Sequence, residues 1–314
     1  MKFKSVFMSY SKTMVPVNGK TPELKPEMPI RYAAYTAFNY FYRNMILNEK
    51  GTLIDNDPES LHYFRVSSKR LRVALSVFRP YLNQTQINYF KDEIKTLAPI
   101  LGSPRDIDVY LEFLTEEVLP EISADERKSL KKYIEFFKES RRNLRRPVME
   151  KINSARYRNF KRRFEVLLAK GLSGCRNSSS SGIAKFAERE INSGVKSLLR
   201  TARLLLRRSS DKRLHRFRIE CRKMRYRTEL FLSLLGDDGK KTARILVEIQ
   251  NALGGWHDSV TACEKLDHFL ELHPQFRRSS SIRNLRKIQK HRIGRFKRKF
   301  FRKLKEIRKI RKFV

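Results

Sequence analysis

The chain has 314 residues, of which 40% are hydrophobic and 33% are charged, and its formal net charge is +37. This length and hydrophobic content support a folded protein with a buried core and exclude a wholly disordered chain. So large a positive charge repels itself, which indicates a multiply charged anion as partner: nucleic acid, an anionic membrane or an inorganic phosphate chain.

Helical periodicity dominates the first half of the chain. Residues 1–28 contain three prolines and little periodicity, which predicts an extended lead-in. From there onward, apolar side chains recur at the spacing of one helix face. We therefore expect a first helical bundle over 29–172, with helices at 29–48, 57–81, 84–101, 104–119 and 123–170, the last of them broken at Pro147.

A serine-rich stretch, 173–182, is the predicted linker between the two halves. The second half, 183–314, again shows helical spacing, and nowhere do β-branched and polar residues alternate as in a strand. Its predicted helices are 183–207, 211–235, 238–254, 258–272 and 282–313. The fold class is therefore all-α, with two antiparallel helical bundles built from long amphipathic helices and short connections.

One basic segment occurs in both halves. The first copy reads His62-x-x-Arg65-x-x-x-Lys69-Arg70-Leu71-Arg72, and the second, 153 positions later, reads His215-x-x-Arg218-x-x-x-Arg222-Lys223-Met224-Arg225. The surroundings repeat as well, since the corner Leu101-Gly102-x-x-Arg105-Asp106 returns as Leu253-Gly254-x-x-His257-Asp258. A repeat this long does not suit a solenoid and indicates two homologous halves.

On a helical wheel, the basic segment forms a charged stripe. At about 100° per residue, the cations of the first copy fall within a sector of about 80°, opposite an apolar face. The stripe residues are His62, Arg65, Lys69 and Arg72, with Arg79 close by, and in the second copy His215, Arg218, Arg222 and Arg225. A solvated face is the alternative, but no Asp or Glu lies between Leu61 and Arg79 to pair with these charges. We therefore expect the stripes to face a groove or channel that holds an external anion.

The repeated segment resembles the CHAD family, the conserved histidine α-helical domain. The likeness rests on H-x-x-R-x-x-x-K-R-L-R, on Phe78-Arg79-Pro80-Tyr81-Leu82 after it and on the L-G-x-x-R-D corner, and it covers both halves. The resemblance implies two bundles related by a pseudo-two-fold around a basic central channel, no catalytic activity of its own, and binding of inorganic polyphosphate, often on polyphosphate granules. The sequence departs from the pattern at His257, where the first half has Arg105.

Twelve residues follow as candidates for polyphosphate binding. Ten correspond by position to the histidines and basic residues of the family, Arg79 extends the stripe, and Arg105 is a rim contact. The full set is His62, Arg65, Lys69, Arg70, Arg72, Arg79, Arg105, His215, Arg218, Arg222, Lys223 and Arg225. Arg can meet two phosphate oxygens with its planar fork, whereas Lys supplies a mobile point charge. No catalytic residue, metal site or cofactor is predicted.

The two stripe histidines predict a pH dependence. Near pH 6.5, an unperturbed His62 or His215 is charged about half the time, and a neighbouring polyanion favours the charged form. Binding should therefore tighten as the pH falls. The alternative for each histidine is a hydrogen bond to backbone at the start of its helix.

The L-G-x-x-[RH]-D corner reads as a break between helices. Gly102 can end one helix in the left-handed conformation, Ser103 can cap the next, and Pro104 suits its first position. Asp106 then lies where an acidic residue favours a helix N-terminus. The same interpretation applies to the copy of the corner in the second half.

The C-terminal segment from Ile282 to Val314 has sixteen Lys and Arg residues and one acid, Glu306. Its apolar residues recur at helical spacing, which predicts an amphipathic basic helix. We expect this helix to dock by its apolar edge, as its counterpart near 124–146 would. A nucleic-acid or membrane-surface arm is the alternative.

The cysteines and apolar segments indicate the compartment. Three cysteines without C-x-x-C spacing argue against a disulfide framework and for a reducing environment. No apolar run approaches the roughly 18 residues of a membrane span, and the first ten residues hold only a broken apolar patch. We expect a cytoplasmic protein with no membrane partner, associated with polyphosphate granules.

Two other functions remain as alternatives to polyphosphate binding. Nucleic-acid binding through the same basic surface fits the charge, but no recognition-helix or RNP signature occurs, and single-strand binders usually interleave aromatic residues. A phosphohydrolase would need His257 and Asp258 as a metal pair, yet the repeat aligns that histidine with Arg105. No phosphate-binding loop of the type G-x-x-x-x-G-K-[ST] occurs either. We therefore expect a protein that is not an enzyme.

Overall fold

The fold is all-α, as predicted. The computed structural model describes residues 21–55, 57–123, 127–172, 182–307 and 310, and this part of the chain forms helices and turns without a strand. Most of the predicted lead-in and of the serine-rich linker, and the end of the last predicted helix, lie outside the described residues. No helix within the described part combines the length and apolar character needed to cross a membrane.

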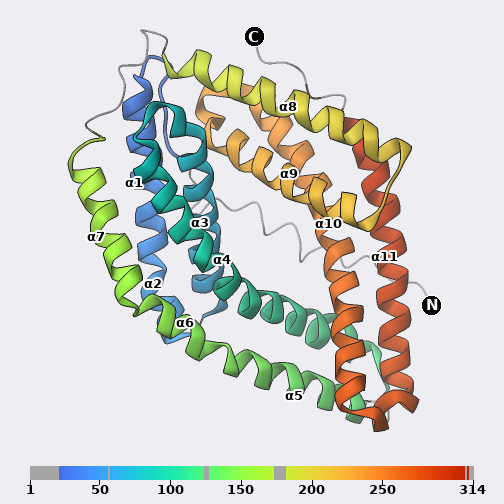
Figure 1. Cartoon of the computed structure of the whole chain (residues 1–314). Coiled ribbons are helices and arrows are strands. Elements are labelled where there is room, and N and C mark those ends of the chain that lie inside the picture. Colours follow the sequence, from blue (N-terminus) through green and yellow to red (C-terminus); the bar gives the residue numbers. More distant parts are fainter. Residues whose placement is uncertain (1–20, 56, 124–126, 173–181, 308–309, 311–314) are drawn as a thin grey trace.

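In the described residues of the first half, the helices are α1 to α7 (Figure 1). Their residue ranges are Ile30–Leu47 (α1), Glu49–Ile54 (α2), Pro58–Phe78 (α3), Gln84–Glu112 (α4), Arg127–Asn143 (α5), Arg145–Ile152 (α6) and Ala155–Ala169 (α7). A 3-10 turn, Arg79–Tyr81, follows α3, and a π-helical turn, Phe113–Val118, continues α4 into the 3-10 turn Leu119–Glu121.

Four helices make up the described second half. They are α8 (Ile183–Arg207), α9 (Asp211–Leu230), α10 (Leu232–Leu272) and α11 (Ser280–Glu306), with a 3-10 turn at Pro274–Arg278. The predicted helices at 29–48 and 183–207 match α1 and α8 closely, because each begins and ends at a clear change of periodicity. The predicted helix 211–235 begins where α9 does but extends past its end at Leu230 into the start of α10.

The predicted break at the L-G-x-x-[RH]-D corner is wrong. The helix α4 runs through Gly102 and Pro104, both buried, without a left-handed residue. Ser103 lies within this helix and donates from Oγ to the Pro99 carbonyl, one turn earlier, at 3.2 Å. Burial of the helix on both sides of Pro104 offsets the roughly 3 kcal/mol that an interior proline costs.

The second copy of the corner is also helical. The helix α10 passes through Gly254, and its interruption lies instead at Gly236. Gly236 has a φ of 55° and a ψ of −144°, a combination that glycine adopts readily because it has no Cβ. In the segment predicted as 123–170, the breaks fall at Leu144 and Asn153 rather than at Pro147. Pro147 lies in the first turn of α6, where its missing N–H leaves no hydrogen bond unmade.

Two hydrophobic cores hold the molecule together, and each is built by both halves. The larger core joins α1, α3, the first part of α4, α6 and α7 to α8, α9, the first part of α10 and the second part of α11. The smaller core joins the end of α4 and α5 to the second part of α10 and the start of α11. Figure 1 shows α4 reaching from the upper group of helices to the lower ends of α10 and α11. The halves defined by the repeat at 29–172 and 183–314 therefore share their cores.

Equivalent helices of the repeat meet each other in the larger core. Phe78 at the end of α3 packs against Phe231 after α9, with ring centroids 6.2 Å apart. Asp57 caps α3 by accepting a hydrogen bond from the Glu59 N–H at 2.9 Å, and Ser210 occupies the equivalent cap of α9. These caps and the shared core position both basic segments on adjacent helices.

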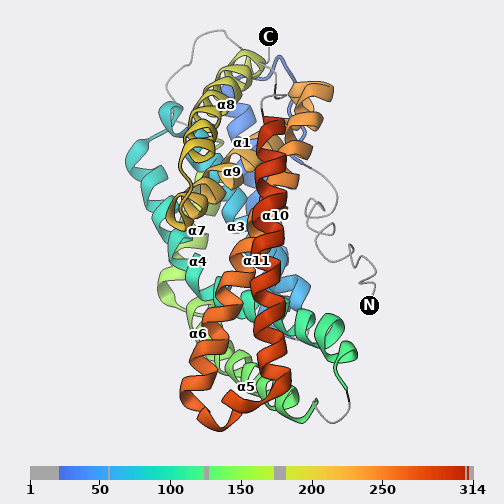
Figure 2. The same ribbon diagram turned by 90° about the vertical axis from the view of Figure 1, so that its right-hand side faces the viewer.

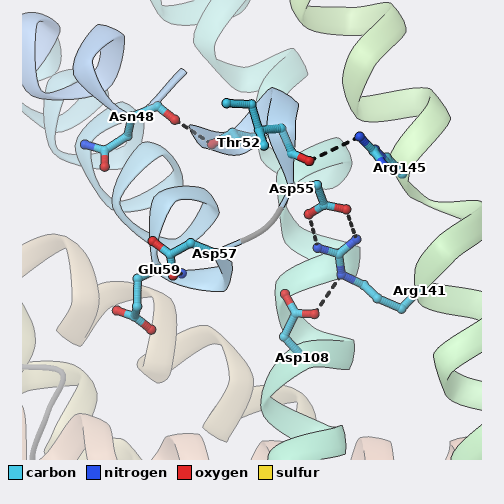
Figure 3. Close-up of polar contacts among 9 residues, drawn as sticks. Asn48, Thr52, Asp55, Asp57, Glu59, Asp108, Arg141 and Arg145 are labelled. Carbon is cyan, nitrogen blue, oxygen red and sulfur yellow. Dashed lines mark hydrogen bonds and ion pairs between the residues drawn. The ribbon is translucent and has the colours of Figure 1, made fainter. Parts of the chain in front are cut away.

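An arginine clamp connects the entrance of α3 to α4 and α5 (Figure 3). Arg141 donates to both carboxylate oxygens of Asp55, at 3.0 and 2.5 Å, and from Nε to Asp108 at 2.7 Å. Arg145 adds a hydrogen bond to the Ile54 carbonyl at 3.1 Å. Asp55 adopts a left-handed φ of 60° at the end of α2, so the clamp holds the bend that leads into α3.

Replacing Arg141 by Ala should destabilise the protein by about 3 kcal/mol, because two largely buried carboxylates lose their shared partner. Urea unfolding followed by circular dichroism would measure the change. Arg142→Ala is the matched control, since its side chain is exposed on the same helix and should cost less than about 0.5 kcal/mol. Equal losses for the two variants would contradict the clamp.

Candidate functional site

A cavity of about 320 Å³ lies where the two basic segments come together. Side chains of α3, α4, α9, α10 and α11 line it, together with the π-helical turn after α4. Nine of the lining residues are Lys or Arg, and three are carboxylates. The cavity is therefore strongly positive and partly enclosed, as expected for the face opposite the apolar side of each stripe.

Eight of the twelve candidate residues line this cavity. Residues from the first half are His62, Arg65, Lys69, Arg70 and Arg105, and those from the second half are Arg218, Arg222 and Arg225. The helices α3 and α9 contribute all of them except Arg105, which comes from α4. The apolar residues predicted to oppose the stripes, such as Phe64 and Phe217, are fully buried in the core.

Four candidate residues lie outside the cavity lining: Arg72, Arg79, His215 and Lys223. Three of these approach Lys91 of α4 closely enough to lower its pKa, in addition to the effect of burial: Arg79, Arg72 and Lys223. Lys91, Arg72, Arg79 and Lys223 therefore form a second basic group beyond the cavity. His215 is exposed near the start of α9, with its ring centroid 5.3 Å from that of His257.

The cations in the cavity differ in whether a carboxylate compensates them. Arg65 forms an ion pair with Asp106 at 2.9 Å, so that aspartate is a partner of the stripe and not a helix cap. Arg105 pairs with Glu59 at 3.1 Å. The expectation of a stripe without acidic partners therefore fails for Arg65, because its partner Asp106 comes from outside the segment between Leu61 and Arg79.

Four cations in the cavity have no carboxylate within 4 Å among the described residues: Lys69, Arg218, Arg222 and Lys265. Lys265 donates instead to the backbone carbonyl of Asp106 at 3.5 Å, which leaves Lys69, Arg218 and Arg222 as the group at the junction of the two stripes. Burial, together with Arg65 and Arg222, lowers the pKa of Lys69 well below its usual range. Burial and Arg218 likewise lower the pKa of Arg222. Within the part of the chain that the structure describes, the Nε of Arg218 is itself buried without a hydrogen-bond partner. An anion in the cavity would supply what this group lacks.

Two further arginines in the cavity are tied to a single glutamate, Glu229, whose side chain is 14% exposed. Arg70 donates to Glu229 at 2.7 Å, and Arg225 lies 3.6 Å from the other oxygen of the same carboxylate. Both guanidinium groups also lie over the ring of Tyr226, at 5.8 and 4.9 Å from its centroid. This arrangement joins α3 to α9 across the two halves, so it supports the cavity as well as lining it.

Cations also cover the other aromatic rings of the cavity wall. Lys265 lies 4.8 Å from the ring centroid of Tyr110, and Arg292 lies 4.3 Å from that of Phe113. Such contacts hold a cation at a fixed place on the wall. They also occupy ring faces on which a nucleobase could otherwise stack.

Sequence reasoning missed the wall that α10 and α11 contribute. Lys265, Arg292 and three amide side chains line the cavity outside the repeated segments; the amides are Gln250, Asn251 and Gln289. Arg292 pairs with Glu117 at 3.0 Å. In the sequence, nothing distinguishes Arg292 from the other Lys and Arg residues of the C-terminal segment. Gln289 could have indicated a polar site, because it is a polar residue on the apolar edge of the predicted helix, where the structure buries it.

The histidines of the cavity are held in the neutral form. Burial lowers the pKa of His62 to about 4, with further contributions from Arg105 and Arg65. Burial and Arg218 lower the pKa of His257 to about 4 as well. The expectation that His62 is half charged near pH 6.5 is therefore wrong for the free protein, because the cations that attract a ligand repel a proton.

His257 and Asp258, the pair that a phosphohydrolase would need, both line the cavity. Among the described residues, however, no group of three or more His, Cys, Asp or Glu side chains is arranged to hold a metal ion. The cations around this pair, Arg218 and Arg222, lower the pKa of His257 and oppose a divalent cation in the same place.

The fold occurs in solved structures. The crystal structure of the CHAD domain from the plant Ricinus communis matches with a TM-score of 0.76 at 22% sequence identity, covering 94% of this chain and 97% of that one. PptA from Streptomyces chartreusis matches with a TM-score of 0.63 at 15% identity, covering 88% of this chain and all of that one, 100%. At these identities, the likeness shows the fold alone.

A search of the curated proteins finds no match. The sequence model of the CHAD domain matches residues 36–267, which is more than half of the chain and includes both basic segments and both copies of the corner. The chain therefore belongs to the CHAD domain family.

Proposed function

We propose that the protein binds linear inorganic polyphosphate in this cavity and does not transform it. The observation that carries the proposal is the convergence of Lys69, Arg218 and Arg222, three cations from both halves without a carboxylate partner among the described residues. Holding them together costs the free protein stability, since like charges repel and burial disfavours the charged forms of Lys69 and Arg222. A polyanion that enters the cavity removes both costs.

The chemistry of the wall favours phosphate over nucleobases. Arginine forks and lysine charges suit the closely spaced oxygens of a phosphate chain. The rings of Tyr110, Phe113 and Tyr226 are covered by Lys265, Arg292 and Arg225. A single strand of nucleic acid would have to displace these cations to stack its bases, so nucleic acid is the secondary candidate for this cavity.

The second basic group gives a long chain a further place to bind. Arg72, Arg79 and Lys223 continue the stripes past the cavity, toward Lys91. We infer that the stripes are related by an approximate two-fold, as the repeat suggests, and that longer chains bind more tightly by reaching this group. Binding of polyphosphate would place the protein in the cytoplasm, on polyphosphate granules.

Calorimetric titration of the full chain with long-chain polyphosphate, orthophosphate and single-stranded DNA tests the proposal directly. Polyphosphate should bind most tightly, and its affinity should fall steeply with salt, as expected when bound counterions are released. Equal affinity for single-stranded DNA and polyphosphate would contradict it. Unchanged polyphosphate after incubation, measured by gel electrophoresis, is the outcome expected without catalysis.

Replacing Lys69, Arg218 and Arg222 together by Ala should weaken polyphosphate binding at least roughly 100-fold, because several charge-assisted hydrogen bonds are lost. The melting temperature of the free variant should stay the same or rise, since the repulsion is relieved. The control variant replaces three exposed cations, Lys212, Arg216 and Lys132, and should bind normally. Equal weakening in both variants would show that overall charge alone governs binding.

Binding should be coupled to proton uptake by His62. A bound polyanion raises the histidine pKa above its free value of about 4, so affinity rises as the pH falls toward 4 and levels off below it. Titrations at about pH 5.5 in two buffers of different ionisation enthalpy would measure the protons taken up. His62→Gln should reduce the uptake, whereas the exposed His268→Gln should not. The same uptake in all three proteins would exclude His62.

A further inference from the structure

The helix α11 presents a continuous row of basic side chains on its outer face, away from the cavity. This outer row consists of Lys287, His291, Arg295, Arg298, Arg302 and Lys305, which follow one another at intervals of three or four residues and are all exposed. Figure 2 looks onto this side of the molecule, where α11 is the outermost helix along its length. At about 1.5 Å per residue, the outer row is about 27 Å long.

The inward-facing cations of α11 form ion pairs with carboxylates, whereas those of the outer row do not. Toward the rest of the protein, Arg286 pairs with Asp267, Arg292 with Glu117 at 3.0 Å, and Lys303 with Glu248 at 2.7 Å. No member of the outer row has a carboxylate within 4 Å among the described residues. Ion pairs among the described residues therefore balance cations on the inner side of α11 but leave the charge of the outer row unbalanced.

The counterpart of α11 in the first half shows that docking does not require such a row. Like α11, α5 buries an apolar edge in the smaller core. Its exposed face mixes signs, however, with Glu135 and Glu139 among its lysines and an ion pair between Lys138 and Glu135 at 2.8 Å. The prediction that α11 docks by its apolar edge is confirmed, and its unbalanced outer charge is an additional feature.

Keeping this charge is unfavourable for the free protein. Burial, then Arg295, Lys303 and Arg302, lower the pKa of the neighbouring Lys299. Like charges three or four residues apart each cost a helix a few tenths of a kcal/mol. Attraction to the helix C-terminus compensates only the last turn, near Lys305. The rest of the outer row calls for an external anion.

We propose that the outer row is a second anion-binding surface and that its partner is the phosphate backbone of double-stranded nucleic acid. A straight, rigid helix face matches a rigid duplex, which carries about one charge per 1.7 Å and loses little freedom on binding. A free phosphate chain is flexible and gains more from the enclosed cavity. The row contains only Lys, Arg and His, so contacts to phosphate without sequence selection are expected.

The surroundings of the outer row argue against a membrane as the partner. An interfacial helix inserts apolar side chains beside its charges. None of the exposed large hydrophobic residues of the described chain lies in α11, whose large apolar side chains point inward or are half-buried. A shallow depression beside Gly294, lined by Arg298, Phe301 and Arg302, instead lets a phosphate approach the helix closely.

The test measures binding of a fluorescent duplex of about 20 bp to the full chain by anisotropy, at salt concentrations of about 50 to 200 mM. Replacing Arg295, Arg298 and Arg302 by Gln should lower affinity at least roughly tenfold at low salt and reduce the slope of log affinity against log salt by about 3. The matched control replaces Lys128, Lys131 and Lys132 of α5 by Gln and should change affinity less than about threefold.

Other outcomes would overturn the proposal. No duplex binding by the wild-type chain, or equal losses in the α5 control, would remove the outer row as a site. If the Lys69, Arg218 and Arg222 variant loses duplex binding as the outer-row variant does, the duplex occupies the cavity. Stronger binding to phosphatidylserine vesicles through the same residues would show a lipid surface. The outer-row variant should still bind polyphosphate in the cavity with unchanged affinity, so calorimetric titration with polyphosphate tests the cavity independently of the outer row.

Discussion

The contact on which the candidate site depends is the one that Glu229 makes with Arg70 and Arg225. Two helices that each carry a row of cations would repel one another if they were placed side by side. The largely buried carboxylate of Glu229 is shared between the buried guanidinium groups of Arg70 and Arg225, which both lie over the ring of Tyr226, and this contact joins α3 to α9. Removing one partner of such a buried group costs several kcal/mol, because the remaining charges stay desolvated. The packing of Phe78 against Phe231 holds the same pair of helices from the apolar side.

This contact allows the cavity to keep charges that the protein does not neutralise. Arg65 and Arg105 are balanced by Asp106 and Glu59, whereas the cluster of Lys69, Arg218 and Arg222 is left without a carboxylate among the described residues. A site that is unfavourable when empty has much to gain from a ligand, since binding relieves repulsion as well as forming contacts. The neutral state of His62 and His257 has a related cause. Burial disfavours their charged forms, and the positive potential that attracts a phosphate chain also repels a proton.

The structure also shows why the two halves form one unit. The long helices α4 and α10 each pass from the larger core to the smaller one. The continuity of α4 through Pro104 and of α10 through Gly254 is what places the cavity between the two cores. A break at either corner, as the local residue pattern predicts, would separate the wall carrying Lys265 from the stripes. Tertiary burial outweighs the local preference here, because the packing contacts of the whole helix offset the cost of its two interior prolines, Pro99 and Pro104.

The all-α class, most helix positions, the repeat and the cationic stripes follow from the sequence alone, because helical periodicity and charge spacing are local properties of the chain. Eight of the twelve candidate residues line one cavity for the same reason, and their part in binding stays a prediction. The continuity of α4 and α10, the partners of Arg65 and Arg105, and the contribution of Arg292 were decided only by the tertiary structure. These features depend on which distant side chains pack together, and burial then sets which charges are compensated and which histidines stay neutral.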